Sequence, residues 1–255
     1  MTRLSRASSN DSILATLNET ADAVSLVLRA NKDWSLSGLR DSQYLVDLRA
    51  DAAALEVLQG AGVAVFSEES EITGAFGEDD ICVIVDPLDG STNASRGVPW
   101  FATALCAIDK SGMRAGLVVN QAMQNDRYWA TTNGGAFHNG VVMRPSSCID
   151  LGEAIVGISG MPIQRPKWAQ FRALGAAALD ICLVADGVTD AWIDFNSHGV
   201  WDYLASILIC QEAGAQVIEY QGRDLIVEDH SHRRTPIVAA TSELLTLAKR
   251  IRDEK

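Results

Sequence analysis

The sequence predicts one domain of the α/β class (mixed α+β), in which helices and strands form layers. Helix-like and strand-like segments interleave along the whole chain. Three consecutive strand-like segments, joined by short turns, predict an antiparallel meander in the middle of the chain. No linker-like composition divides the 255 residues, which are enough for an ample core. We therefore expect a single domain over residues 1–255, with an α+β half over about 1–145 and an α/β half over about 146–255.

Two helices and two strands are expected first along the chain. Apolar residues recur at helical spacing from Asp11 to Ala30 and again from about Tyr44 to Gln59. A short apolar strand is expected over Val63–Phe66. The segment Ile81–Val85 is apolar and rich in β-branched residues, which predicts a strand buried on both faces. Pro87 cannot donate to a sheet ladder, so we expect the strand to stop there and turn.

The remaining elements follow from periodicity and turn signals. The meander comprises Phe101–Asp109, Met113–Met123 and Arg127–Thr132. The segment Asn133–Gly140 is rich in glycine and asparagine and predicts a compact turn region. After it we expect strand Ala154–Ser159, helix Gly175–Ala185, strand Asp190–Phe195, helix Trp201–Ala213, strands Gln216–Tyr220 and Ile237–Ala240, and helix Ser242–Asp253.

The composition restricts the partners and the compartment. A formal net charge of −12 argues against nucleic acid, because phosphate backbones attract clustered Lys and Arg. The one basic cluster, His230–Arg234, is short and is expected to be a solvated loop. No apolar run approaches the ~18 residues that span a bilayer, and the polar segment Met1–Asn10 lacks the apolar core of a signal peptide. The five cysteines are scattered without CxxC spacing, so we expect reduced, buried thiols in a cytoplasmic protein.

Two carboxylates come directly after the central strand. Asp86 and Asp89 are followed by Gly90, which permits close backbone approach, and by Ser91–Asn93, which predicts a helix start. Carboxylates next to helix-start amides suit a hard cation that carries a phosphate. An acidic protein can bind a phosphorylated small molecule when metal ions supply the positive charge.

Three further acidic positions can join this site. The Glu68–Glu69 pair follows a short apolar strand, so a shared sheet edge would bring it close to Asp86. Asp202 lies in the first turn of an apolar helix, and Asp51 lies among alanines on another. Each also has a purely structural interpretation: a solvated loop for the glutamates, stabilisation of a helix N-terminus for Asp202, and simple exposure for Asp51. The run Asp86–Asp89 is harder to explain in that way, because a turn needs only one Asp and the glycine.

Three motifs in this order resemble the inositol monophosphatase family. They are Ser67-Glu68-Glu69-Ser70, the run Asp86-Pro87-Leu88-Asp89-Gly90-Ser91-Thr92-Asn93, and Trp201-Asp202 followed by Glu212-Ala213-Gly214. The resemblance covers roughly Asp47 to Ala240. It implies a layered αβαβα sandwich of the sugar-phosphatase type. It also implies a lithium-sensitive, Mg²⁺-dependent phosphomonoesterase that forms a homodimer.

The resemblance implies a role for each matching residue. Two or three Mg²⁺ ions would be held by Glu68, Asp86, Asp89 and Asp202, together with the backbone carbonyl of Leu88. The catalytic residues would be Asp51, Ser91 and Glu68, with Ser91 and Asp51 activating the attacking water. The residues that contact the substrate would be Gly90, Ser91, Thr92, Ala177, Asp194 and Asp202, with Ala177 and Asp194 facing the polyol hydroxyls.

The substrate and one alternative class of function stay open at this point. Asp194 stands where many members of the family carry Glu, which leaves the identity of the substrate open. The resemblance makes inositol 1-phosphate the first substrate to consider, with histidinol phosphate and fructose 1,6-bisphosphate as alternatives. The spacing of Asp86 and Asp89 argues against a haloacid-dehalogenase-type phosphatase, which uses Asp-x-Asp, and against an EF-hand. A catalytically silent, metal-binding partner protein is the alternative of another class. The presence of every expected ligand argues against it.

Overall fold

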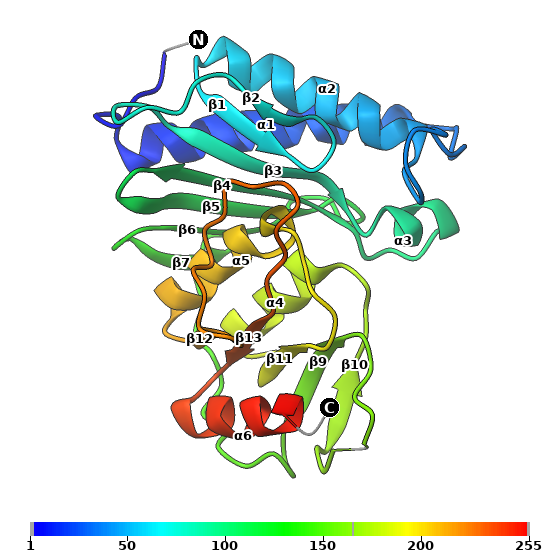
Figure 1. The fold of residues 1–255 in the computed structure, drawn as a ribbon, viewed down its shortest axis with the longest axis vertical. Helices are drawn as coiled ribbons and strands as arrows, with labels where there is room; N and C mark the ends of the chain where they lie inside the picture. Colours follow the sequence, from blue (N-terminus) through cyan, green and yellow to red (C-terminus); the bar gives the residue numbers. More distant parts are fainter. Residues whose placement is uncertain (1–2, 165, 254–255) are drawn as a thin grey trace.

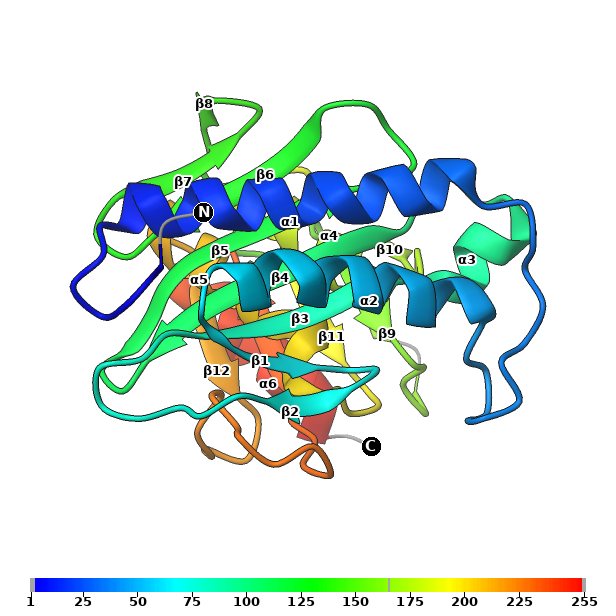
Figure 2. The ribbon, with the colours of Figure 1, turned by 90° about the horizontal axis from the view of Figure 1, so that it is seen from above.

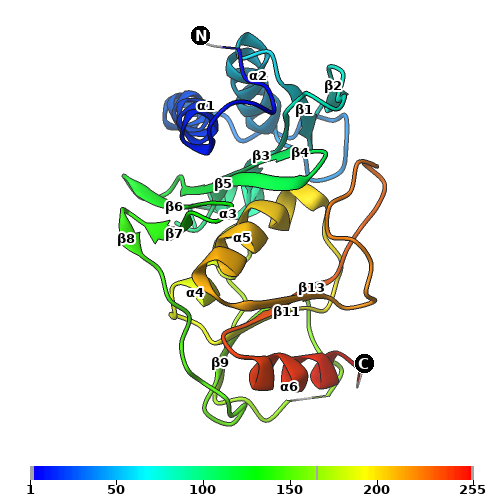
Figure 3. The same ribbon diagram turned by 90° about the vertical axis from the view of Figure 1, so that its left-hand side faces the viewer.

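The computed structural model describes residues 3–164 and 166–253, so Met1, Thr2, Arg165, Glu254 and Lys255 of the expected domain lie outside the described residues. The elements form alternating layers of helices and sheets, and the expected αβαβα sandwich is confirmed (Figures 1 and 3). Figure 2 shows two long helices side by side over the first sheet. The outer helices are α1 (Asn10–Ala30) and α2 (Leu45–Gly60), the middle helices are α4 (Ala177–Ala185) and α5 (Val200–Ala213), and the helix at the far face is α6 (Ser242–Asp253).

The first sheet has eight strands in the spatial order β2-β1-β3-β4-β5-β6-β7-β8. β1 and β3 are parallel and the other neighbouring pairs are antiparallel, so the expected meander is confirmed as β4, β5 and β6. The bounds are β1 Ala64–Ser67, β2 Glu71–Thr73, β3 Cys82–Asp89, β4 Ala102–Asp109, β5 Gly112–Asn120, β6 Asp126–Thr131, β7 Gly135–His138 and β8 Val141–Val142. The short helix α3 (Ser91–Arg96) follows β3 directly.

The second sheet has five strands in the spatial order β10-β9-β11-β13-β12. β9 lies between β10 and β11 and is parallel to both, whereas β13 pairs with its two neighbours in antiparallel fashion. The bounds are β9 Ile155–Ser159, β10 Gln170–Arg172, β11 Ala191–Asp194, β12 Gln216–Glu219 and β13 Pro236–Ala239.

The central strand β3 separates two parts of the hydrophobic core. Val83 and Val85 pack with the apolar faces of α1 and α2, and Cys82 and Ile84 pack on the opposite face with α4 and α5. This alternation follows from the two-residue period of a strand. Because both faces are covered, the strand is apolar at every position before its carboxylates, as expected from the sequence.

β3 does not stop at Pro87, contrary to the sequence prediction. It continues to Asp89 through a bulge, where its pairing register with β4 shifts between Asp86 and Asp89. A bulge leaves one residue unpaired, so the missing N–H of proline is tolerated there. The bulge keeps the strand in the sheet while it redirects the two carboxylates.

The turn region expected over Asn133–Gly140 contains a strand, β7, which pairs with β6. Asn133 and Gly135 adopt positive φ angles of 61° and 81°, which make the turn tight enough for the chain to fold back into the sheet. The strands β2, β8 and β10 are absent from the sequence prediction, because two or three residues show no measurable period.

Four of the five cysteines are buried and Cys148 is half-buried, and all five are free thiols. In the described part of the chain, no helix has both the length and the apolar character needed to cross a membrane.

Candidate active site

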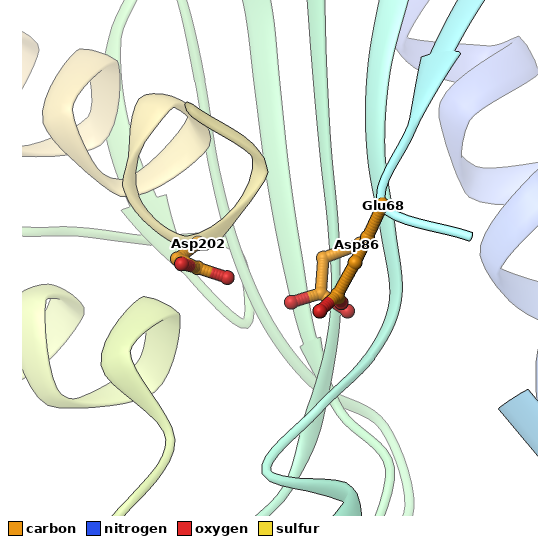
Figure 4. Close-up of side chains that lie close together, drawn as sticks. All are labelled: Glu68, Asp86 and Asp202. Carbon is orange, nitrogen blue, oxygen red and sulfur yellow. The ribbon is translucent and has the colours of Figure 1, made fainter. Parts of the chain in front are cut away.

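Three carboxylates from separate elements meet at one edge of the first sheet. Glu68 directly follows β1, Asp86 lies in β3, and Asp202 lies in the first turn of α5. One oxygen from each lies within 4.8 Å of the others, and Figure 4 shows the three side chains converging. The register explains the first two positions, because Ser67 pairs with Val85 in parallel β1 and β3. Glu68 and Asp86 are therefore the next residues at the same edge.

The bulge in β3 holds Asp86 in place. Oδ1 of Asp86 accepts a hydrogen bond of 2.9 Å from the backbone N–H of Leu88, and the hydroxyl of Thr103 donates to the carbonyl of Pro87 over 2.9 Å. Asp86 is 1% exposed. The bonded side chain has little freedom to leave the cluster.

Asp89 stands beside this triad and is engaged by helix α4. Its two carboxylate oxygens accept the backbone N–H groups of Ala177, at 3.2 Å, and Ala178, at 2.7 Å. The start of a helix carries unpaired amides and a positive dipole, so a carboxylate is stabilised there. Asp89 thus joins α4 to the end of β3 while it lines the cavity.

Asp202 caps its own helix and also belongs to the carboxylate cluster. Oδ2 accepts the N–H of Gly199 over 2.8 Å, which caps the start of α5. The structural interpretation from the sequence is therefore correct, but incomplete, because the same carboxylate also completes the triad with Glu68 and Asp86.

The four carboxylates line a cavity of about 200 Å³ together with Leu88, Gly90 and Ser91. Burial raises the pKa of each carboxyl, and repulsion between them adds to the rise at Glu68, Asp86 and Asp89. Such a set of closely spaced oxygens is unfavourable by itself and fits a hard divalent cation, which prefers oxygen ligands and neutralises their charge. The residues present therefore fit a metal ion.

Gly90 is required by its surroundings. Its φ of 80° lies in the left-handed region, and an added Cβ would stand 3.1 Å from Cβ of Ala176 and 3.1 Å from the carbonyl oxygen of Gly175. Gly90 and Ser91, at the start of α3, line the same cavity as the carboxylates.

Comparison with known proteins places this chain in a family. The family model for the inositol monophosphatase family matches residues 10–254. The chain belongs to the inositol monophosphatase family. A curated relative in Archaeoglobus fulgidus, named fructose-1,6-bisphosphatase/inositol-1-monophosphatase, is 34% identical over 205 residues, or 78% of this chain and 79% of that protein.

Two other relatives carry a different name. The Nus factor SuhB of Escherichia coli K12 is 29% identical over 228 residues, which are 82% of this chain and 80% of that protein. The crystal structure of the extragenic suppressor protein suhB from Bartonella henselae superposes with a TM-score of 0.79 at 26% identity. It covers 95% of this chain and 99% of that one. The fold expected for a member of the inositol monophosphatase family is therefore confirmed.

In this family member, the acid that lines the cavity from α2 is Asp47, not Asp51. Asp47 is 3% exposed and its Oδ2 accepts the N–H of Tyr44 over 2.8 Å, whereas its buried Oδ1 has no partner in the part of the chain that the structure describes. Burial raises the pKa of Asp47 to about 7. Asp51 lies one helical turn further on, where it accepts the hydroxyl of Ser67 over 2.5 Å, and is not among the residues lining this cavity. Sequence analysis missed Asp47 because both acids lie on the same face of the helix.

A second cavity of about 250 Å³ adjoins the first, because Asp89 and Asp202 line both. Ala177 lines it, as the resemblance implies, together with Ser159, Asp180 and His198. Burial raises the pKa of the Asp180 carboxyl to about 7.

Two residues expected to contact the substrate lie elsewhere. Asp194 has no exposed surface, and its carboxylate is taken up by the N–H of Asn196, at 2.8 Å, and by Nδ1 of His198, at 2.9 Å. Asp194 therefore binds His198, which lines the second cavity, and is not itself among the residues that line it. Burial opposes the charged form of His198, but the hydrogen bond with Asp194 and the charges of nearby carboxylates outweigh it and raise its pKa to about 9. Thr92 is exposed on α3 and does not line the first cavity.

The Glu212-Ala213-Gly214 motif has a structural role in this family member. The two carboxylate oxygens of Glu212 accept the N–H groups of Asn133, at 2.9 Å, and Gly135, at 3.0 Å. The end of α5 thereby holds the turn between β6 and β7. Gly214 ends the helix with a left-handed φ of 98°.

Proposed function

We propose that this protein is a Mg²⁺-dependent phosphomonoesterase that hydrolyses a small phosphorylated polyol, with inositol 1-phosphate as the first substrate. The observation that carries the proposal is the convergence of Glu68, Asp86 and Asp202, whose ligand oxygens lie within 4.8 Å of one another. An all-oxygen set of this kind suits Mg²⁺. Membership of a family with metal-dependent phosphatases supports the reaction class.

The proposed roles follow from the lining of the first cavity. Glu68, Asp86, Asp89 and Asp202, with the carbonyl of Leu88, would hold two or three Mg²⁺ ions. When bound, Mg²⁺ neutralises phosphate charge and lowers the pKa of water. The backbone of Gly90 and Ser91 faces the phosphate, and the Ser91 hydroxyl orients the attacking water.

The proton of the attacking water needs an acceptor at the cavity wall. Asp47 lines the cavity, its buried Oδ1 has no hydrogen-bond partner among the described residues, and its pKa of about 7 is suited to general base catalysis near neutral pH. Asp51 accepts the hydroxyl of Ser67 and is not among the residues that line the cavity. We therefore assign the role of proton acceptor to Asp47.

The second cavity would receive the alcohol part of the substrate. It meets the first at Asp89 and Asp202, so a phosphoester can extend from one into the other. Ser159 and His198 offer polar atoms to hydroxyl groups, and Ala177 offers apolar contact. The archaeal relative is named for activity on two substrates, so fructose 1,6-bisphosphate stays an alternative, as does histidinol phosphate.

The test is phosphate release from these three compounds, measured with Mg²⁺ and with excess chelator. We expect release that requires Mg²⁺, is highest in kcat/KM for inositol 1-phosphate, and is abolished in Asp86→Asn without loss of the fold. The matched control is Asp79→Asn, which makes the same change at an exposed carboxylate. Release that survives complete chelation, or that survives Asp86→Asn, would reject the proposal. A protein that binds Mg²⁺ and hydrolyses none of a wide phosphomonoester panel would instead be a metal-binding partner protein.

Three further properties belong to the same proposal. We expect Li⁺ to inhibit phosphate release, as in many members of the family, and a lithium titration in the same assay tests this. We expect a cytoplasmic homodimer. Light scattering after size-exclusion chromatography tests the dimer, because a monomer has 27.4 kDa.

A further inference from the structure

The loop between α1 and α2 contributes directly to the wall of the first cavity. Arg40 to Gln43 of this loop line the cavity. Among the described residues that line it, Arg40 carries the sole Arg or Lys side chain. A single cationic side chain beside seven acidic residues needs an explanation from its contacts.

Every contact of the Arg40 guanidinium shown by the structure goes to the segment that supplies the metal ligand Glu68. Nη1 donates to the carbonyl oxygen of Glu68 over 2.9 Å, and Nη2 donates to the carbonyl oxygen of Glu69 over 2.8 Å. Nη2 also pairs with Oε2 of the Glu69 side chain over 2.6 Å. The planar fork of arginine makes this combination possible, and a lysine ammonium cannot reproduce it.

These contacts separate the two neighbouring glutamates. Glu69 is directed toward Arg40 and Gln43, whose amide also donates to Oε2 of Glu69. Glu68 is directed toward Asp86 and Asp202. The Glu69 side chain is 7% exposed, so without Arg40 it would be a buried carboxylate beside the metal ligands with no Arg or Lys partner among the described residues.

The Glu68–Glu69 backbone is also contacted by the loop His230–Arg234, which was expected to be a solvated loop. Nε2 of His230 lies 3.0 Å from the carbonyl oxygen of Glu68, which can only accept, so this nitrogen carries the proton of the bond. The His230 ring packs against the ring of Trp201, the neighbour of Asp202, with centroids 4.4 Å apart. Two loops therefore hold the Glu68 carbonyl between them.

We propose that Arg40 is a positioning residue of the metal site: it fixes the Glu68–Glu69 backbone so that Glu68 faces the cations and Glu69 is held away from them. This inference rests on the proposed function only in requiring that the cavity binds Mg²⁺. The Arg40 side chain is 43% exposed, so solvent screens part of its attraction to the buried Glu69 carboxylate. We therefore expect the two backbone bonds to contribute most of its effect on the segment.

The experiment is calorimetric titration of MgCl₂ into the metal-free protein, without substrate. Replacing residues that orient metal ligands typically weakens metal binding by about 10- to 100-fold. Because His230 still holds the Glu68 carbonyl, we expect the lower end for Arg40→Gln, about a tenfold rise in Kd. Arg40→Lys keeps the charge and loses the fork, so we expect most of the same rise. It also provides a second variant should Arg40→Gln fold poorly.

The matched control is Arg49→Gln. Arg49 holds the far end of the same loop, where its Nη2 donates to Oδ1 of Asn31 over 2.7 Å, and it does not line the cavity. We expect its Kd for Mg²⁺ to match that of the native protein. A double-mutant cycle between Arg40→Gln and Glu69→Gln should be non-additive, because the two side chains act on the same segment.

An unchanged Kd in both Arg40 variants, or an equal rise in Arg49→Gln, would overturn the inference while leaving the proposed function intact. If the native protein binds no Mg²⁺, the inference and the proposed function fall together. If the native protein binds Mg²⁺ but releases no phosphate, the proposed function fails alone, and the titrations still decide the role of Arg40.

Discussion

Neutralising one carboxylate of the first cavity should stabilise the protein when no Mg²⁺ is bound. In Asp86→Asn, the Asn Oδ1 keeps the acceptor for the N–H of Leu88, so the bulge survives. The change removes one charge from a buried cluster whose oxygens lie within 4.8 Å of one another. Asp86→Asn should therefore raise the unfolding free energy of the metal-free protein while it abolishes phosphate release.

The magnitude follows from Coulomb's law. Two unit charges 4.8 Å apart repel by about 3 kcal/mol at an effective dielectric constant of about 20. The raised pKa of Asp86 allows the native state to keep some protons, which reduces the repulsion, so we expect a net gain of about 2 kcal/mol. For a chain of this size, that gain corresponds to a rise in Tm of about 4–8 °C.

The pH dependence has a definite sign. Burial and the neighbouring carboxylates raise the pKa of Asp86 in the folded state above its ordinary value of 3.8. Native stability therefore falls as the pH rises from the unfolded pKa to the folded pKa. The gain in unfolding free energy of Asp86→Asn over the native protein is absent well below pH 3.8. It is complete at pH values above the folded pKa of Asp86.

The assay is calorimetric unfolding at pH 8 in chelator and again in excess Mg²⁺. Bound Mg²⁺ should stabilise the native protein, by about 2.7 kcal/mol at 100 times its Kd, and should stabilise Asp86→Asn far less. Asp79→Asn, at an exposed position, should follow the native protein in both conditions. A lower Tm for Asp86→Asn than for the native protein in chelator would show that the carboxylates do not repel one another as argued.

Three other predictions concern the framework around the site. Glu212→Ala removes the acceptor for two backbone N–H groups, so it should lower the unfolding free energy by about 1–2 kcal/mol in urea, with unchanged phosphate release per folded molecule. Gly116→Ala places a Cβ 2.8 Å from the carbonyl oxygen of Ala205, and calorimetry should show a loss of about 1–3 kcal/mol. Burial disfavours charge on His138, but hydrogen bonds with Asp126 and Asp186 raise its pKa. The resulting stability is present below about pH 6.5 and is lost as the pH rises through the folded pKa, and urea unfolding of His138→Gln should lack this dependence.

The sequence alone was sufficient for the long elements and for most of the carboxylates that line the first cavity. α1, α5 and α6 show a clear period or end signals, and the buried strand before Asp86 is apolar at each position. The convergence of Glu68 with Asp86 was accessible as well, because two adjacent parallel strands end at the same edge of a sheet. These features depend on local patterns.

Only the tertiary structure decided which side chains face the cavities. Asp47 and Asp51 lie one helical turn apart on α2. The packing of α2 against β1 brings Asp51 into hydrogen-bond contact with Ser67 and leaves Asp47 at the first cavity. Asp194 was expected to meet the substrate, but His198 covers it. Arg40 belongs to a loop without a period and reaches residues 28 positions away. Local patterns specify helices and strands, but contacts between distant residues depend on how these elements pack, and packing is decided by the whole chain at once.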